Sequence, residues 1–132
     1  MLFMMSPAAH AASGIGFAQA EEGTWYCKGD DPVAALKCAA KKCEAEAAGQ
    51  GCVRTKWCFN ARWSGFMTVF LPDFHSTEII CGAPDRQALH AAFKAYCAGN
   101  KYALNCSLSI MIDPSGKELE ITDAEFPGPK AP

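Results

Sequence analysis

The sequence predicts an α+β fold. Two β-α-β-β units would form one antiparallel sheet, with two helices on one face and disulfides fastening the layers. The first observation is a cysteine frame that occurs twice, in residues 27–52 and 81–106, at an offset of 54 residues. The frame consists of Cys27, Cys43 and Cys52 in the first copy and of Cys81, Cys97 and Cys106 in the second, with fifteen and then eight residues between its members. The second observation is that strand-like and helix-like stretches alternate in the same order in both copies.

The overall composition favours a small disulfide-bonded domain made in an oxidising compartment. With 132 residues, the chain has room for one domain or two small interlocked halves. A formal net charge of −2 provides no basic field, so we expect no nucleic-acid partner. Eight cysteines without a C-x-x-C pair favour disulfides made in an oxidising compartment over a metal site. No motif for a cofactor is present, and we predict none.

Residues 1–20 have the composition of a signal peptide or an N-terminal arm. The stretch is apolar and rich in small residues, and it changes abruptly to the polar EEGTW. Ala18-Gln19-Ala20 and Ala9-His10-Ala11 both have the A-x-A form of a signal-peptidase site. The apolar run is too short and too interrupted for a transmembrane segment. We therefore expect a periplasmic or secreted protein.

The first repeat is expected over residues 24–71. Thr24–Cys27 is aromatic and strand-like, and Asp31-Pro32 then starts a helix, with Asp as its cap, that ends near Gly49. Two stretches rich in aromatic and β-branched residues follow, Cys52–Phe59 and Gly65–Leu71. The segment NARWS joins them, so the pattern predicts an aromatic hairpin.

The second repeat is expected over residues 77–122. Thr77–Cys81 is a strand, and GAPD starts a second helix that ends near Gly99. Ser107–Ile112 leads into the turn signal DPSG and a further strand over Lys117–Thr122. Residues 21–122 would thus be a single disulfide-rich domain, and residues 123–132 a loose Pro-rich tail.

The eight cysteines are all expected in disulfides. Each repeat supplies three shared cysteines, an odd number, so they cannot all pair within their own repeat. The simplest of the 105 possible connectivities makes two local bridges, one between the repeats and one for the two extra cysteines. Its pairs are Cys43–Cys52, Cys97–Cys106, Cys27–Cys81 and Cys38–Cys58. The other connectivities stay open.

A family resemblance accompanies this pattern. Ala34-Ala35-Leu36 precedes Cys43 and Cys52, and Ala88-Leu89 precedes the equivalent pair Cys97 and Cys106. In this respect, residues 24–112 resemble the bacterial secreted family called domain of unknown function 4189. The resemblance implies a leader peptide, an oxidising compartment and a duplicated architecture. It implies no catalytic residues.

Residues 56–74 are the most suggestive stretch for function. Two tryptophans and four phenylalanines lie there with Lys56 and Arg62, a composition that protein interfaces enrich. We predict a partner-binding hairpin with Trp63 as its exposed anchor. The alternative is that strand alternation sends half of the rings into the core. The predicted contact residues are Trp57, Phe59, Arg62, Trp63 and Phe66.

Catalytic candidates have simpler structural explanations. Cys81 precedes a helix and has His75 and His90 nearby in sequence, which suits a Cys-His nucleophile, but Cys81 repeats the context of Cys27 and is expected in a bridge. Asp31 is explained as a helix cap. We predict no catalytic and no metal-binding residue.

Asp30 and Asp73 could be imagined with Asp31 as the carboxylates of a hydrolase. Asp73 has the chemistry of a turn and Asp31 that of a helix cap, so these residues do not support a hydrolase site.

The leading hypothesis is a non-enzymatic domain that binds another protein, such as an inhibitor or immunity-type protein. One alternative is a structural accessory subunit of a cell-envelope complex, docking through residues 1–20 and the Pro-rich tail. A second alternative is a small cysteine-dependent enzyme. The identity of the partner and the oligomeric state stay open.

Overall fold

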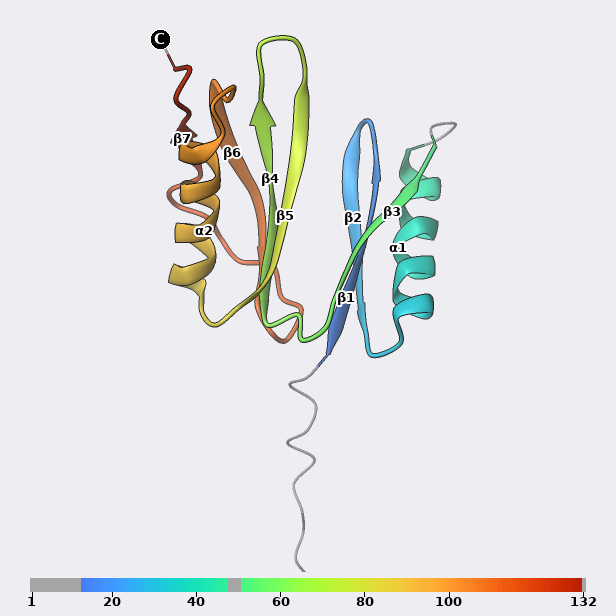
Figure 1. Cartoon of the computed structure of the whole chain (residues 1–132). Helices are drawn as coiled ribbons and strands as arrows, with labels where there is room; N and C mark the ends of the chain where they lie inside the picture. The colour runs from blue at the N-terminus through green and yellow to red at the C-terminus, as the bar shows by residue number, and fades with distance from the viewer. Residues whose placement is uncertain (1–12, 48–50, 132) are drawn as a thin grey trace, which may run out of the picture. The chain divides into compact units, whose positions relative to one another are not determined.

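The computed structural model describes residues 13–47 and 51–131. The chain divides into two compact units, one ending at Asn60 and the other beginning at Ala61 (Figure 1). Each unit contains a helix and an antiparallel sheet, and all eight cysteines are in disulfides. The predicted α+β, disulfide-stapled fold is therefore confirmed.

The first unit has a three-stranded sheet. Strands β1 (Gly14–Ala20) and β2 (Gly23–Gly29) form a hairpin, and the helix α1 (Pro32–Glu46) follows. Strand β3 (Val53–Cys58) then pairs with the other side of β1, which gives the strand order β2-β1-β3. The first strand of the unit is therefore its central strand.

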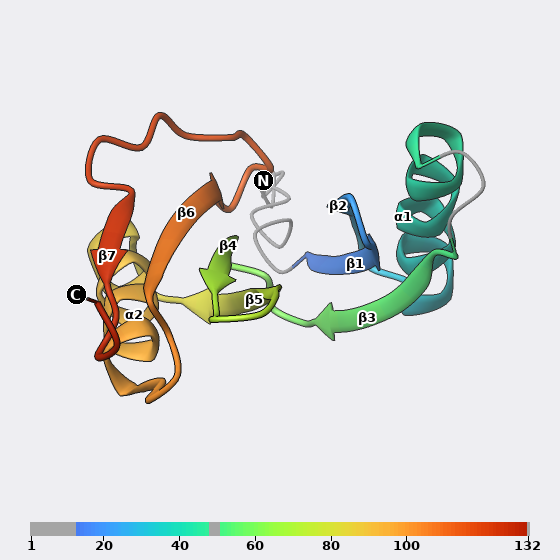
Figure 2. The same cartoon turned by 90° about the horizontal axis from the view of Figure 1, so that it is seen from above.

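The second unit repeats this topology. Strands β4 (Trp63–Phe70) and β5 (His75–Ala83) form the hairpin, α2 (Arg86–Gly99) follows, and β6 (Asn105–Ile112) pairs with the other side of β4. A short strand, β7 (Glu125–Pro127), adds to β6, so the order is β5-β4-β6-β7. Each helix lies beside its own sheet (Figure 2).

The repeated unit is β-β-α-β rather than β-α-β-β. The expected single sheet is wrong, because the strands form separate sheets of three and four. The expected repeat bounds, 24–71 and 77–122, are displaced by one strand for the same reason. The strand expected over residues 65–71 belongs to the second unit, and the first unit takes its opening strand from residues 14–20.

Strand β1 explains why a leader-like composition can be part of a fold. A Cβ on Gly16 would lie 3.0 Å from the backbone of Ala35, so α1 packs directly on this strand. Small residues permit that close approach. Ile15 and Phe17 are fully buried. The expected boundary at residue 20 is therefore wrong for residues 14–20, and cleavage there would remove the central strand. Ala9-His10-Ala11 lies outside the described residues.

Both helices begin as the sequence predicts. The carboxylate of Asp31 accepts a hydrogen bond from the amide of Val33, and Pro32 is the first helical residue. Asp85 caps α2 in the same way by accepting from the amide of Ala88 at 2.8 Å. Both caps satisfy amides that the helix itself leaves without a partner.

The two helices bury different kinds of side chain. The buried face of α1 consists of alanines and Cys43, whereas Val33 in the first turn is 65% exposed. The α2 face carries larger side chains, including Leu89 and Phe93, which are fully buried in the main core of the second unit. Alanine lets α1 approach its sheet closely, whereas α2 fills its space with larger groups.

The C-terminal segment is part of the fold. Phe126 is 2% exposed within the core of the second unit. The amides of Gly128 and Lys130 donate to the carbonyls of Leu104 and Ala103, each at 3.0 Å. The expectation of a loose tail over residues 123–132 is therefore wrong for these residues, because a buried aromatic ring and backbone hydrogen bonds hold them.

The disulfides confirm half of the expected pairing. Cys43–Cys52 and Cys97–Cys106 join each helix to the chain leading into the following strand, as predicted. Cys27 is bonded to Cys38, so the expected pairs Cys27–Cys81 and Cys38–Cys58 are both wrong. The reason is topological: β2 runs directly into α1, and their Cα atoms at these positions lie 6.0 Å apart. Eight cysteines in disulfides fit a protein of an oxidising compartment.

The turn after β6 also forms as predicted. The carboxylate of Asp113 accepts hydrogen bonds from the hydroxyl of Ser115 and from the amides of Ser115 and Lys117. These bonds, the Ser115 hydroxyl first, lower the pKa of Asp113 below its ordinary value. Gly116, with φ of 92°, supplies the left-handed residue that the turn requires.

Candidate functional site

The predicted aromatic hairpin does not exist as a hairpin. Strand β3 pairs with β1, whereas β4 pairs with β5 and β6, so the two stretches belong to different sheets. Residues 59–62 connect the two units instead of forming a turn within one. The prediction failed because a short polar segment between two strand-like stretches has the same local pattern in either arrangement.

The five predicted contact residues differ in exposure. Phe66 is buried, and Trp63 is half-buried and packs against the core of the second unit, so Trp63 is not the exposed anchor that we expected. Trp57 is also half-buried, with its indole ring over Gly14. Phe59 is 63% exposed, and Arg62 is exposed with φ of 45°. Phe59 and Arg62 are therefore the most exposed of the five predicted contact residues.

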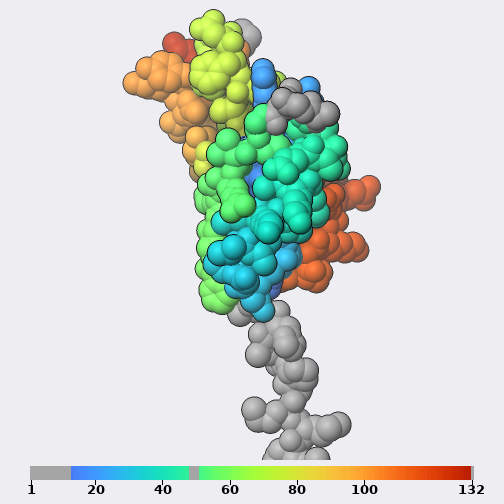
Figure 3. All heavy atoms as spheres, turned by 90° about the vertical axis from the view of Figure 1, so that its right-hand side faces the viewer, coloured from blue at the N-terminus to red at the C-terminus, as the bar shows by residue number. Residues whose placement is uncertain are grey.

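A second aromatic surface lies at one end of the second unit. Phe70 ends β4 and is 39% exposed, Phe74 lies in the following turn and is 66% exposed, and Tyr102 precedes β6 and is 56% exposed. We call these three residues the aromatic tip. Figures 1 and 3 place the β4–β5 turn and the segment after α2 side by side. The amide of Leu104 donates to the carbonyl of Phe70 at 2.8 Å, which joins the two segments.

The backbone around the aromatic tip is held by hydrogen bonds. The amide of Leu71 donates to the carbonyl of Phe74 at 2.8 Å and closes the turn. The amide of Tyr102 donates to the side chain of Asn100 at 3.2 Å. A held backbone presents its side chains to a partner with a smaller loss of conformational entropy on binding.

Polar groups surround the aromatic tip. The ammonium of Lys101 lies 5.0 Å from the ring centroid of Tyr102, and His75 lies beside Phe70 with the ring centroids 6.3 Å apart. Tyr96, on α2, is 38% exposed. Burial raises the pKa of Tyr96, and the charge of Glu78 and a hydrogen bond with it raise the pKa further. Exposed rings bordered by polar groups are the usual composition of a protein-binding surface.

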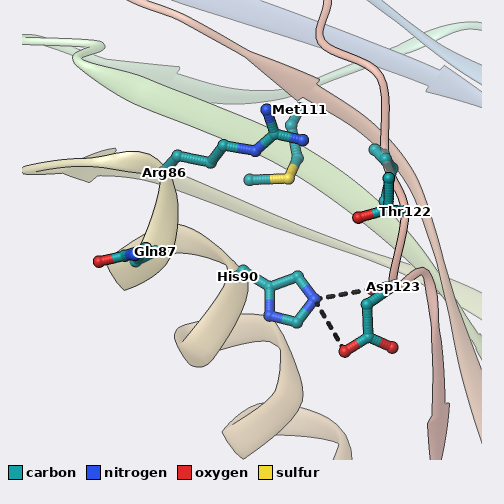
Figure 4. A pocket seen from close by; sticks show the side chains of 7 residues that line it. Arg86, Gln87, His90, Met111, Thr122 and Asp123 are labelled. Carbon is teal, nitrogen blue, oxygen red and sulfur yellow. Dashed lines mark hydrogen bonds and ion pairs between the residues drawn. The ribbon is translucent and has the colours of Figure 1, made fainter.

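A pocket of about 390 Å³ lies at the other end of α2. Arg86, Gln87 and His90 line it from the first turns of α2, Met111 lines it from β6, and residues 121–123 lie opposite. Figure 4 shows the guanidinium group of Arg86 beside the side chain of Met111, with His90 directed toward Asp123. The pocket thus combines one cationic group with an apolar wall.

Hydrogen bonds from α2 hold the wall opposite the helix. The Nη2 atom of Arg86 donates to the carbonyl of Glu120. His90 Nε2 lies 2.7 Å from the carbonyl oxygen of Asp123, which can only accept, so this nitrogen carries the proton. The same nitrogen lies 3.6 Å from the Asp123 carboxylate, and the His90 ring packs edge-on against Phe126. These contacts fix residues 120–126 against α2 and so hold the pocket wall in place.

The candidate catalytic residues from the sequence are either part of the fold or exposed on its surface. All eight cysteines lie within the described residues and all are in disulfides, so Cys81 is not a free nucleophile. Asp31 caps α1, and Asp73 and His75 are exposed at the β4–β5 turn. Among residues 13–47 and 51–131, no group of three or more His, Cys, Asp or Glu side chains could hold a metal ion. Over the same residues, no helix has the length and apolar character needed to cross a membrane.

Sequence reasoning missed both surfaces of the second unit. Phe70 and Phe74 lie within the suggestive stretch 56–74 but are not among the predicted contact residues. A signal was present: Pro72-Asp73 marks a turn, and two phenylalanines flank it. The pocket had no local signal, because its walls come from α2, β6 and residues far along the chain.

The chain matches no protein-family model, no curated protein and no solved structure. The resemblance to domain of unknown function 4189 therefore stays a prediction.

Proposed function

We propose that this chain is a periplasmic or secreted protein-binding domain that contacts its partner through the aromatic tip. The observation that carries the proposal is the exposure of Phe70, Phe74 and Tyr102 on adjoining, hydrogen-bonded segments. Aromatic rings are over-represented among the residues that dominate binding energy at protein interfaces. A large apolar ring kept in water has an unfavourable free energy that a partner would relieve.

The disulfides support a role as a rigid scaffold. Cys97 and Cys106 are fully buried and fasten α2 to the start of β6, next to the loop that carries Tyr102. A bridged scaffold loses less conformational entropy when it binds, which suits an inhibitor or immunity-type protein. The N-terminal segment is part of the same proposal: if it is a signal peptide, Ala9-His10-Ala11 is the cleavage site that leaves β1 in the mature chain.

The alternatives receive less support. A cysteine-dependent enzyme needs a free thiol, and every cysteine is in a disulfide. In the accessory-subunit alternative, docking through residues 14–20 or through Phe126 would require the release of β1 or of a core side chain. The partner could instead bind at Phe59 and Arg62, which are the two exposed residues of the surface predicted from the sequence.

Site-specific photocrosslinking tests where a partner binds. A benzophenone amino acid is placed at position 74, at position 59 or at the control position 33, whose valine is 65% exposed on α1. The full chain is expressed in the cells that make it, and crosslinked partners are identified after irradiation. We expect one protein to crosslink from position 74 and not from position 33.

The partner is then purified and its affinity measured for three variants. Phe74→Ser should weaken binding by about tenfold or more, whereas Val33→Ser should change it less than twofold. Crosslinking from position 59 with loss of binding in Phe59→Ser would move the interface to the segment between the units. Crosslinking only to second copies of the chain, or equal crosslinking from all three positions, would contradict a specific partner at the aromatic tip.

A further inference from the structure

We infer that the pocket at the start of α2 binds the C-terminal residue of a peptide, or a free N-acyl amino acid of the same chemistry. The required groups are a carboxylate, an adjacent apolar side chain and an amide N–H. This site is separate from the aromatic tip and does not depend on the partner proposed above. Figure 4 shows the pocket with its lining side chains.

Arg86 supplies the carboxylate recognition. A guanidinium has five N–H donors in a planar fork that matches the two oxygens of a carboxylate. One nitrogen of Arg86 donates to the carbonyl of Glu120, which fixes the side chain against the opposite wall. Among the described residues, the guanidinium makes no ion pair with a carboxylate. Its charge is therefore available to an anionic ligand.

The wall beside Arg86 selects an apolar side chain. Met111 is 1% exposed, and Ile121 packs partly buried against the core of the second unit. Both side chains line the pocket. Met111 therefore forms the buried base of this wall, and Ile121 presents the apolar surface that a ligand side chain would contact. A leucine-sized group placed here would lie beside its own carboxylate on Arg86.

The far end of the pocket selects a hydrogen-bond donor rather than a second anion. The Asp123 carboxylate lies there, 69% exposed, next to His90. It would repel an additional negative charge and accept a hydrogen bond from an amide N–H. The hydroxyl of Thr122 offers a further acceptor. This order of cation, apolar wall and acceptor matches an acylated amino acid better than a fatty acid or a phosphate.

The size of the pocket agrees with one residue. About 390 Å³ lies near the lower limit for ligand-binding pockets. One amino acid with its acyl group fits such a volume, and the rest of a peptide would leave through the open side. Because a single residue makes few contacts, we expect a Kd on the order of 1 mM.

The test is an NMR titration of the full, oxidised chain. N-acetyl-leucine is added to ¹⁵N-labelled protein, and N-acetyl-leucinamide, which lacks the carboxylate, is added to a second sample. We expect saturable shifts at Arg86, His90 and Thr122 with the acid, and binding at least tenfold weaker with the amide. A short peptide ending in leucine separates the two sources, since tighter binding than N-acetyl-leucine favours a peptide C-terminus.

Two variants complete the test. Arg86→Gln should weaken N-acetyl-leucine by about tenfold, whereas Lys94→Gln, which removes an exposed cation farther along α2, should leave its Kd within twofold. The backbone spectrum of each variant shows whether its fold is retained. Equal binding of acid and amide, equal loss in the two variants, or no saturable shift up to about 20 mM would each overturn the proposal.

Discussion

Cys97 on α2 and Cys106 on β6 are joined by a disulfide with their Cα atoms 6.1 Å apart and nine residues of sequence separation. The bridge from α1 in the first unit, Cys43–Cys52, has the same sequence separation and the same Cα distance. In both units the bridge fastens the C-terminal part of the helix to the start of the following strand. The repeated cysteine frame therefore records a repeated β-β-α-β unit.

The disulfides should differ in their contribution to stability. Replacing Cys97 and Cys106 together by alanine should lower the free energy of unfolding by about 3–5 kcal/mol, because both are fully buried and a cavity adds to the lost chain constraint. Replacing Cys27 and Cys38 should cost about 2–3 kcal/mol, because Cys38 is exposed. Urea unfolding of both variants measures the difference. A larger loss for the Cys27–Cys38 pair would contradict this packing.

The N-terminal boundary can be tested by truncation. A chain that starts at Ala12 should unfold cooperatively, because it keeps all of β1. A chain that starts at Glu21 should lose its cooperative transition in the first unit, because Ile15, Phe17 and Ala18 are fully buried. Circular dichroism melts and a count of reactive thiols distinguish the two. Native-like folding from Glu21 would mean that β1 is dispensable.

Gly65 should not tolerate a side chain. A Cβ at this position would lie 2.3 Å from the carbonyl oxygen of Ile110 on the neighbouring strand, and backbone cannot move aside as a side-chain end can. Gly65→Ala should therefore destabilise the chain by about 1–3 kcal/mol. Gly51→Ala is the matched control, since nothing lies within 4 Å of its Cβ position. Equal urea midpoints for the two variants would refute the close approach of β4 and β6.

Tyr96 should titrate above its ordinary pKa of 10.0. Burial is the first cause, and Glu78 adds a negative charge and a hydrogen bond. Glu78→Gln should therefore lower the pKa of Tyr96, while Glu44→Gln on α1 should not change it. Ultraviolet titration of tyrosinate, assigned by NMR, measures the shift.

The same shift has a consequence for stability. Because the folded-state pKa is raised, Tyr96 contributes to stability below about pH 10, and that contribution is lost as the pH rises through the folded-state pKa. In Glu78→Gln, the folded-state pKa lies closer to its ordinary value, so the loss should be smaller and should be complete at a lower pH. An unchanged Tyr96 pKa in that variant would mean that Glu78 does not act on this group.

Local signals in the sequence predicted the parts of the fold that depend on neighbours along the chain. The Asp31-Pro32 cap and the Asp113 turn are hydrogen-bonded within a few residues, so their patterns are sufficient. The bridges Cys43–Cys52 and Cys97–Cys106 span nine residues and were equally accessible.

What failed depended on which strands pair. Residues 14–20 look like a leader because Gly16 must be small for α1 to approach, and composition does not separate those two causes. Because residues 14–20 were assigned to the leader, the first unit lacked a strand in the prediction, and residues 65–71 were assigned to it instead. The partner-binding hairpin then follows wrongly. The pocket could not be anticipated, because Arg86 and Asp123 meet only after β6 and β7 are in place.

Disulfide mapping of the chain, purified unreduced from its native compartment, tests the duplicated bridged scaffold most directly. Proteolysis without reductant, followed by mass spectrometry, should yield peptides linked through Cys27–Cys38, Cys43–Cys52 and Cys97–Cys106, with no thiol alkylated before reduction. Linked peptides joining Cys27 to Cys81 or Cys38 to Cys58, or free thiols in the native protein, would contradict the β-β-α-β repeat and its oxidising compartment.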